Sequence, residues 1–105
     1  MGGGAVVRFP RPFLQQQSTD MEEKIRELVA ALTPISDIAI LLGMDEIELR
    51  DAIDEYENPI SIAYRKAKAE VALDIRKAHI ALAQEGDKDA AEKVAEYFLN
   101  MTRDE

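Results

Sequence analysis

The chain has 105 residues, no cysteine and a formal net charge of −8, from 21 acidic and 13 basic side chains. This length allows one domain with a modest core. The lack of cysteine excludes disulfides and thiolate metal sites, which fits a reducing compartment. Tryptophan is absent and glycine is sparse, whereas alanine, glutamate, leucine, isoleucine and lysine are abundant. This composition predicts an all-α fold.

The N-terminal stretch MGGGAVVRFPRPFLQQQ differs in composition from the rest of the chain. Its glycine, proline and glutamine content predicts a disordered tail over residues 1–19. The apolar run is too short for a signal peptide, and two prolines follow it. No apolar run in the chain approaches the roughly 20 residues that a membrane span requires, so no membrane association is expected.

Residues 20–57 are expected to form a helix-turn-helix domain of three short helices. The first helix is predicted from about Asp20 to Leu32, with Thr19 and Glu22 as a capping box at its start. Apolar residues at helical spacing give this helix one apolar stripe. The stripe consists of Met21, Ile25, Leu28, Val29 and Leu32.

The second helix is predicted from about Pro34 to Leu42, capped by Thr33. Ala39 must be small because two helices cross close to it. Gly43 stands where the following turn needs a positive φ, which a side chain would resist.

The third helix is predicted from about Glu46 to Tyr56. Asp45 caps it, with Glu48 three residues later as a capping-box partner. The inward-facing residues of this helix are Leu49, Ala52 and Ile53. An ordinary αα-hairpin is the alternative to a helix-turn-helix here.

Residues 58–105 are expected to form an antiparallel helical hairpin that mediates oligomerisation. Asn58 and Pro59 are typical of a helix start, and nothing interrupts the helical pattern before Gly86, which predicts a helix of roughly 26 residues. Asp87 then opens the last helix. Its apolar stripe is Ala91, Val94, Phe98 and Met101.

The long helix carries apolar side chains on two opposed faces, at 100° per residue. The first face consists of Tyr64, Ala67, Val71, Ile75, Ala78 and Leu82. The second face consists of Ile62, Ala69, Leu73 and Ile80. A small monomer needs only one apolar face on such a helix, so the second face is expected to be the interface with other copies. The alternative is that the first and last helices cover both faces within one subunit.

Charge is spread unevenly along the chain. Residues 20–57 hold twelve acidic and three basic side chains, a net charge of −9, whereas residues 1–19 and 58–85 each carry +2. Affinity for nucleic acid depends largely on neutralising phosphates, so the predicted helix-turn-helix is a weak DNA binder by itself. The positions of its third helix that would face a major groove are mostly acidic. They are Asp45, Glu46, Ile47, Arg50, Asp51 and Asp54.

Contact with DNA is therefore expected through basic side chains that lie mostly outside this segment. They are Arg8, Arg11, Arg50, Arg65, Lys66 and Lys68.

Three segments, in this order, resemble the small terminase subunits of tailed bacteriophages: DIAILLGMDEIELRDAI, ENPISIAYRKAKAE and ALAQEGDKDAAEKVAEYF. Together they cover roughly residues 33–100. The resemblance implies a homeodomain-like helix-turn-helix followed by an oligomerising helical hairpin. Members of that family often have basic or polar residues on the third helix, and this chain departs from that pattern.

The resemblance also implies a role in viral genome packaging, in the cytoplasm of a bacterial host. The subunit would form a homo-oligomeric ring of about eight or more copies. It would bind double-stranded DNA near the packaging start and pass it to the terminase large subunit, which holds the ATPase and nuclease.

No catalytic motif supports an enzyme. His79 is the only histidine, so no histidine pair exists for a metal or a proton relay. The acidic run over residues 45–57 lacks the glycine-bearing loop of an EF-hand, and MGGG precedes no phosphate-binding motif. The chain is therefore expected to be no enzyme and to use neither cofactor nor metal.

Two other functions fit the sequence. One is a dimeric transcriptional regulator of a phage or mobile element. The other is an acidic protein-interaction module that does not bind DNA.

Overall fold

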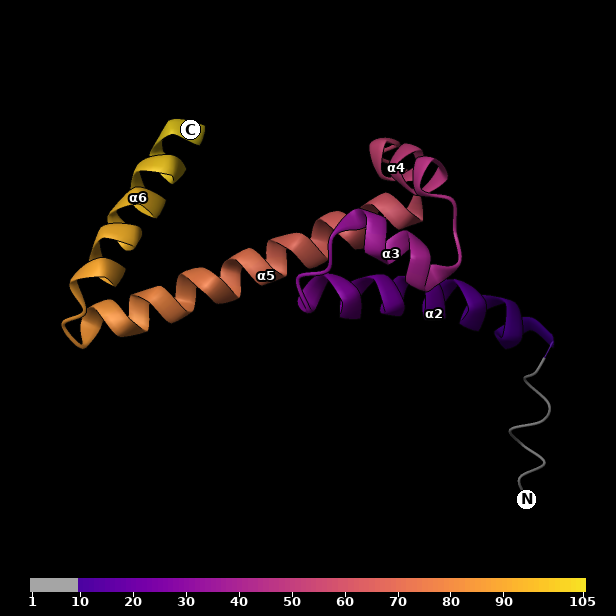
Figure 1. Ribbon diagram of the computed structural model, residues 1–105, viewed down its shortest axis with the longest axis horizontal. Coiled ribbons are helices and arrows are strands. Elements are labelled where there is room, and N and C mark those ends of the chain that lie inside the picture. Colours follow the sequence, from indigo (N-terminus) through magenta and orange to yellow (C-terminus); the bar gives the residue numbers. More distant parts are fainter. Residues whose placement is uncertain (1–9) are drawn as a thin grey trace, which may run out of the picture. The chain divides into compact units, whose positions relative to one another are not determined.

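The computed structural model describes the backbone of residues 10–105 and the side chains of residues 20–105. This part of the chain forms five helices and no strand, which confirms the predicted all-α fold. The helices are α2 (Pro10–Ala30), α3 (Ile35–Leu42), α4 (Glu46–Asp54), α5 (Pro59–Gln84) and α6 (Lys88–Asp104), labelled in Figure 1. None of these helices is long and apolar enough to cross a lipid bilayer.

The chain divides into two compact units between Lys68 and Ala69, so α5 runs through both. The first unit contains α2, α3, α4 and the start of α5. The second contains the rest of α5 and α6. The divisions predicted after residues 19 and 57 stay predictions, as does the antiparallel course of the last helix.

The first helix is longer than the sequence pattern indicates. Helix α2 begins at Pro10, so the start predicted at Asp20, with its capping box, is wrong. Prolines in the first turn of a helix cost little because their missing amide donors would have no intrahelical partner. Leucine and glutamine, which follow in residues 14–17, are good helix formers. Residues 10–19 are therefore helical although a disordered tail was expected there, and residues 1–9 lie outside the described part.

The core of the first unit joins α2, α3 and α4. Ile25 and Val29 of α2, Ile38 and Ala39 of α3, and Leu49 of α4 are all buried. Five aliphatic side chains exclude water here, and the small Ala39 lets the helices approach closely. The predicted inward positions Ala52 and Ile53 are half-buried.

The end of α2 changes two predictions. Leu32 has a φ of 63° and its side chain is 70% exposed, so it is not part of the buried stripe. The amide of Thr33 donates to the carbonyl of Leu28 at 3.0 Å, which closes the C-terminus of α2. Thr33 is therefore used by α2, and the N-cap of α3 is Pro34, with no side-chain capping bond.

The turn between α3 and α4 follows the sequence prediction. Gly43 has a φ of 74°, and the amide of Met44 donates to the carbonyl of Ala39 at 2.9 Å. The Asp45 carboxylate then accepts from the amides of Ile47 and Glu48, at 3.1 and 3.2 Å. This cap satisfies two amides of α4 that have no intrahelical partner. Helix α4 ends at Asp54, two residues before the predicted end.

Capping residues also fix the starts of α5 and α6. The Asn58 side-chain oxygen accepts from the amide of Ile60 at 2.9 Å, and α5 then runs for 26 residues, as predicted. Gly86 has a φ of 100°, and the Asp87 carboxylate accepts from the amide of Ala90 at 2.8 Å. The start of α6 at Lys88 agrees with the prediction.

The buried side of α6 differs from the predicted stripe at its first turn. Ala90 is buried and Ala91 is exposed. Val94 is half-buried, whereas Phe98 and Met101 are exposed.

Replacing Gly43 with alanine is expected to lower the free energy of unfolding by about 1 to 2 kcal/mol, because a Cβ disfavours this left-handed backbone conformation. Apart from Gly43 itself and its two chain neighbours, no heavy atom lies within 4 Å of the position that the Cβ would take, so the effect is one of backbone conformation alone. Urea denaturation measures it, with Gly43→Asn as the control because asparagine tolerates positive φ better. An alanine variant as stable as the parent would contradict this account.

Candidate nucleic-acid and assembly surfaces

The predicted DNA-binding residues lie on three elements, and the structure describes only part of them. Arg8 precedes the described residues, and Arg11 lies in α2 with its side chain outside the described part. Arg50 lies on α4. The other three are on the first turns of α5, in the first unit: Arg65, Lys66 and Lys68.

Arg65 connects α5 to the end of α4. Its Nη2 donates to the carbonyl of Tyr56 at 2.8 Å, and its guanidinium carbon lies 4.4 Å from the centre of the Tyr56 ring. Its Nε donates to the hydroxyl of Ser61 at 3.1 Å. Ser61 is fully buried, and its hydroxyl donates to the carbonyl of Ile53 at 2.6 Å.

These contacts satisfy carbonyl groups at the C-terminal end of α4, where the helix dipole is negative. A cation is favourable at this position, and the planar guanidinium can bond and stack at the same time. Arg65 therefore contributes to the fold of the first unit. Its prediction as a DNA ligand stays a prediction. A variant that replaces Arg65 would therefore change the stability of the first unit as well as any contact with DNA.

The two lysines of this segment are exposed but lie on different sides of α5. By helical spacing, Lys68 lies about 60° from Arg65, whereas Lys66 lies about 160° from Lys68. The Lys68 ammonium is 5.5 Å from the centre of the Tyr64 ring. The predicted basic residues therefore form no single stripe, and each lysine would meet a phosphate separately.

The outer face of α4 is acidic. Arg50 donates from Nε to Glu46 Oε2 at 2.9 Å, and both side chains are about half exposed. Such an exposed pair contributes little to stability, but it neutralises the only cation of this helix. The remaining charges on α4 are those of Glu48, Asp51 and Asp54.

The second unit contains an apolar groove of about 670 Å³ between α5 and α6. Its apolar lining is Leu73, Ile80, Val94, Tyr97, Phe98 and Met101. Leu73 and Ile80, predicted as oligomer interface, thus face the same groove as three residues of the stripe predicted on α6. The polar side chains along the groove are Arg76, Lys77, Asn100 and Asp104.

The other two predicted interface residues lie outside this groove. Ile62 is 50% exposed and belongs to the first unit, and Ala69 is exposed at the start of the second.

The first apolar face of α5 is covered only at its beginning. Ala67 is buried and Val71 is half-buried, but Ile75 and Leu82 are exposed. The second unit therefore leaves apolar side chains uncovered on both faces of its long helix.

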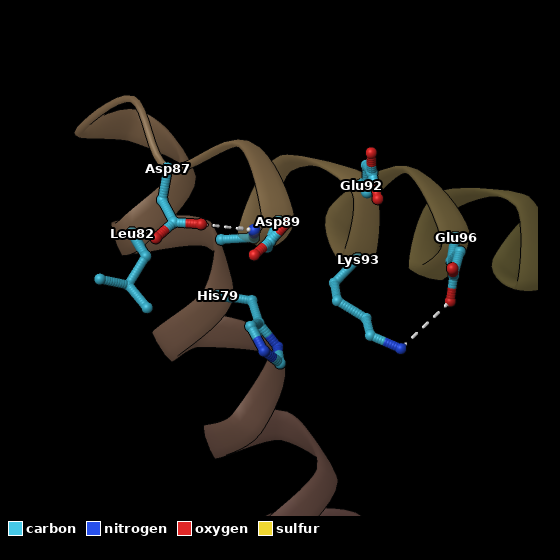
Figure 2. A pocket seen from close by; sticks show the side chains of 8 residues that line it. His79, Leu82, Asp87, Asp89, Glu92, Lys93 and Glu96 are labelled. Atoms are coloured by element: carbon cyan, nitrogen blue, oxygen red, sulfur yellow. Dashed lines mark hydrogen bonds and ion pairs between the residues drawn. The ribbon is translucent and has the colours of Figure 1, made fainter.

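A polar hollow of about 550 Å³ lies where α5 meets the first turns of α6, and Figure 2 shows its lining. Its residues are His79, Leu82, Asp87, Asp89, Ala90, Glu92, Lys93 and Glu96. The Tyr97 hydroxyl is 2.8 Å from Nδ1 of His79, and the two rings are 5.6 Å apart between centroids.

Several polar groups of this hollow have partners in the structure. Asp87 caps α6, and the Lys93 ammonium lies 3.6 Å from the Glu96 carboxylate. Among residues 20–105, no cluster of three or more histidine, aspartate or glutamate side chains could hold a metal ion. The hollow therefore offers polar contacts that support the α5–α6 connection.

Comparisons of the chain with family models, curated proteins and solved structures gave no match.

Sequence reasoning missed Ser61, Tyr97 and the lining of the groove from α6. A serine beside a helix start is typical of a cap, so the sequence carried no signal that its hydroxyl would bond across to α4. The contact between Tyr97 and His79 joins residues 18 positions apart, which helical periodicity does not relate.

Replacing Ser61 with alanine is expected to lower the free energy of unfolding by about 1 to 3 kcal/mol, because the carbonyl of Ile53 loses its buried donor. Thr102→Ala is the matched control, since its exposed hydroxyl donates to a carbonyl of its own helix at 3.0 Å. Thermal denaturation compares the two variants. Equal effects would mean that Ser61 does not join α4 to α5.

Proposed function

We propose that this chain is a non-enzymatic, self-assembling DNA-binding subunit that serves viral genome packaging, as small terminase subunits do. The observation that carries the proposal is the uncovered apolar surface of the second unit. Seven large apolar side chains there are between 42% and 61% exposed. They are Leu73, Ile75, Ile80, Leu82, Phe98, Leu99 and Met101.

Leaving this surface in water is unfavourable, since burial of apolar area gains about 25 cal/mol per Å². Monomeric proteins rarely expose contiguous apolar patches of more than a few hundred Å², and larger patches mark interaction sites. The groove also carries the charges that a second copy could pair. Arg76 and Lys77 lie on α5, and Asp104 lies near the end of α6. Copies of the chain are therefore its proposed partners.

The first unit supplies the features that support DNA binding. Its α3 and α4 are joined by a turn with the small residue, glycine and N-cap that the predicted helix-turn-helix requires. The acidic α4 is unsuited to phosphate, so Lys66 and Lys68 are proposed as the contacts of each subunit, together with Arg8 and Arg11. So few cations per subunit bind DNA weakly, and assembly multiplies these contacts along one duplex.

Replacing Leu73 and Ile80 together with aspartate is expected to reduce the assembly to subunits of 11.7 kDa, because charge would then line the groove on α5. Both side chains are 42% exposed within one chain, so the helical circular dichroism should be retained. Light scattering coupled to gel filtration measures the mass.

Leu32→Asp is the matched control for assembly. Leu32 is 70% exposed, lies in the first unit and has a positive φ that aspartate tolerates. The parent and this control should have the mass of a ring of about eight or more subunits. A parent protein of 11.7 kDa at micromolar concentration would contradict assembly, and a stable dimer would contradict the ring.

Replacing Lys66 and Lys68 with glutamine is expected to weaken binding to duplex DNA about tenfold and to reduce the slope of log K against log salt by about 2 per bound subunit. Arg65 stays unchanged in this variant because it holds the end of α4. Fluorescence anisotropy with a labelled duplex, titrated at several salt concentrations, measures both quantities. Lys88→Gln with Arg103→Gln makes the same change of charge on α6 and should leave binding within twofold. Equal losses in the two variants would remove Lys66 and Lys68 from the DNA interface.

A further inference from the structure

The helix-turn-helix exposes aliphatic side chains on both sides of its turn. Ile40 and Leu41 at the end of α3 are 74% and 61% exposed, and Ile47 at the start of α4 is 69% exposed. At 100° per residue, Ile40 lies about 160° from the buried Ile38, and Leu41 lies about 160° from the buried Ala39. These side chains point away from the core of the first unit, and no described element of the chain covers them.

The charged side chains of the helices that carry these aliphatic groups are mostly acidic. On α4, Ile47, Asp51 and Asp54 are four and three residues apart and form one stripe, opposite the buried Leu49. Residues 35–54 hold six acidic side chains and one basic side chain, Arg50, which is paired with Glu46. An aliphatic surface within a negative field fits a ligand that is both apolar and positively charged.

We propose that this face of α3 and α4 docks a basic polypeptide segment whose apolar side chains contact Ile40, Leu41 and Ile47. Lysine or arginine side chains of that segment pair with Asp51 and Asp54. The acidic surface attracts the segment over a distance and sets the sign of its charge, and burial of the isoleucines supplies the affinity. This inference goes beyond the proposed function and does not depend on it.

Two other occupants fit this face less well. Duplex DNA carries a dense negative charge, which the carboxylates beside Ile47 would repel. A second copy of the chain brings a net charge of −8 of its own, and its assembly surface lies on the other unit. A basic segment is not expected to bind in the apolar groove of that unit, because Arg76 and Lys77 line the groove and would repel it.

The test uses the full chain with labelled isoleucine δ1 methyl groups, whose NMR signals stay observable in a large assembly. The probe is a synthetic peptide of about fourteen residues that alternates pairs of lysine and leucine, a length chosen to span a helix face. The signals of Ile40 and Ile47 should shift and saturate on titration. Those of Ile62, Ile75 and Ile80, which are exposed on α5, should not move.

Two variants separate the apolar from the electrostatic contribution. Ile47→Ser should weaken binding about tenfold, as expected for loss of one buried aliphatic side chain. Asp51→Asn with Asp54→Asn should weaken it about fivefold and make the remaining binding less sensitive to salt. The matched control, Glu92→Gln with Glu96→Gln, makes the same change of charge on α6 and should alter binding less than twofold.

Four results would overturn the proposal. The first is a shift of the Ile62, Ile75 or Ile80 signals as large as that of Ile47, and the second is equal binding of a peptide in which serine replaces every leucine. The third is a shift of the Ile47 signal on addition of duplex DNA, and the fourth is a change of the Ile40 and Ile47 signals with protein concentration alone. The third result would assign this face to nucleic acid and the fourth to contacts between copies. None of them would alter the outcome for Leu73 and Ile80 or for Lys66 and Lys68.

Discussion

Helix α5 has 26 residues and is about 39 Å long, and within the described part of the chain several of its apolar side chains stay exposed. The first unit buries one side of its first turns, through Ser61 and Ala67. Beyond Val71 the only further helix of the described chain is α6, which carries exposed apolar side chains of its own. We propose assembly because apolar area exposed to water on both α5 and α6 is unfavourable in a monomer.

The distribution of charge separates the surfaces that we propose. Affinity for phosphate depends largely on cations, and the only cation of α4, Arg50, is paired with Glu46. The exposed lysines lie on α5 and most of the carboxylates lie on α4, so the two proposed partners, DNA and a basic polypeptide, would contact different helices of the first unit. The outer face of α4 is then available for the proposed contact with a polypeptide.

The contacts of Ser61 and Arg65 join the end of α4 to α5 in the first unit. Through these two side chains, carbonyls near the end of α4 are bonded to α5, and the Tyr56 ring packs on the guanidinium. Without these bonds, the carbonyls of Ile53 and Tyr56 would lose their side-chain donors. The orientation of α4, and with it the direction of its acidic face, therefore depends on these two side chains of α5 as well as on the burial of Leu49.

Local chemistry explains what the sequence determined. Gly43, Asp45, Asn58, Gly86 and Asp87 act on backbone groups within a few residues, so their pattern predicted the turns and the length of α5. The same locality explains the error at α2, where prolines near the start are compatible with a helix once they occupy its first turn.

Only the tertiary structure decided which charged side chains are bonded within the fold and which remain free for a partner. Arg65 and Lys66 are adjacent and have equal charge, yet Arg65 bonds to the end of α4 because its guanidinium reaches a carbonyl nine residues away. Periodicity likewise placed Leu73 and Ile80 on one face of a helix, but the groove exists because Val94, Phe98 and Met101 come from a second helix. Spacing along one helix fixes the direction of a side chain, whereas its partner depends on how separate helices pack.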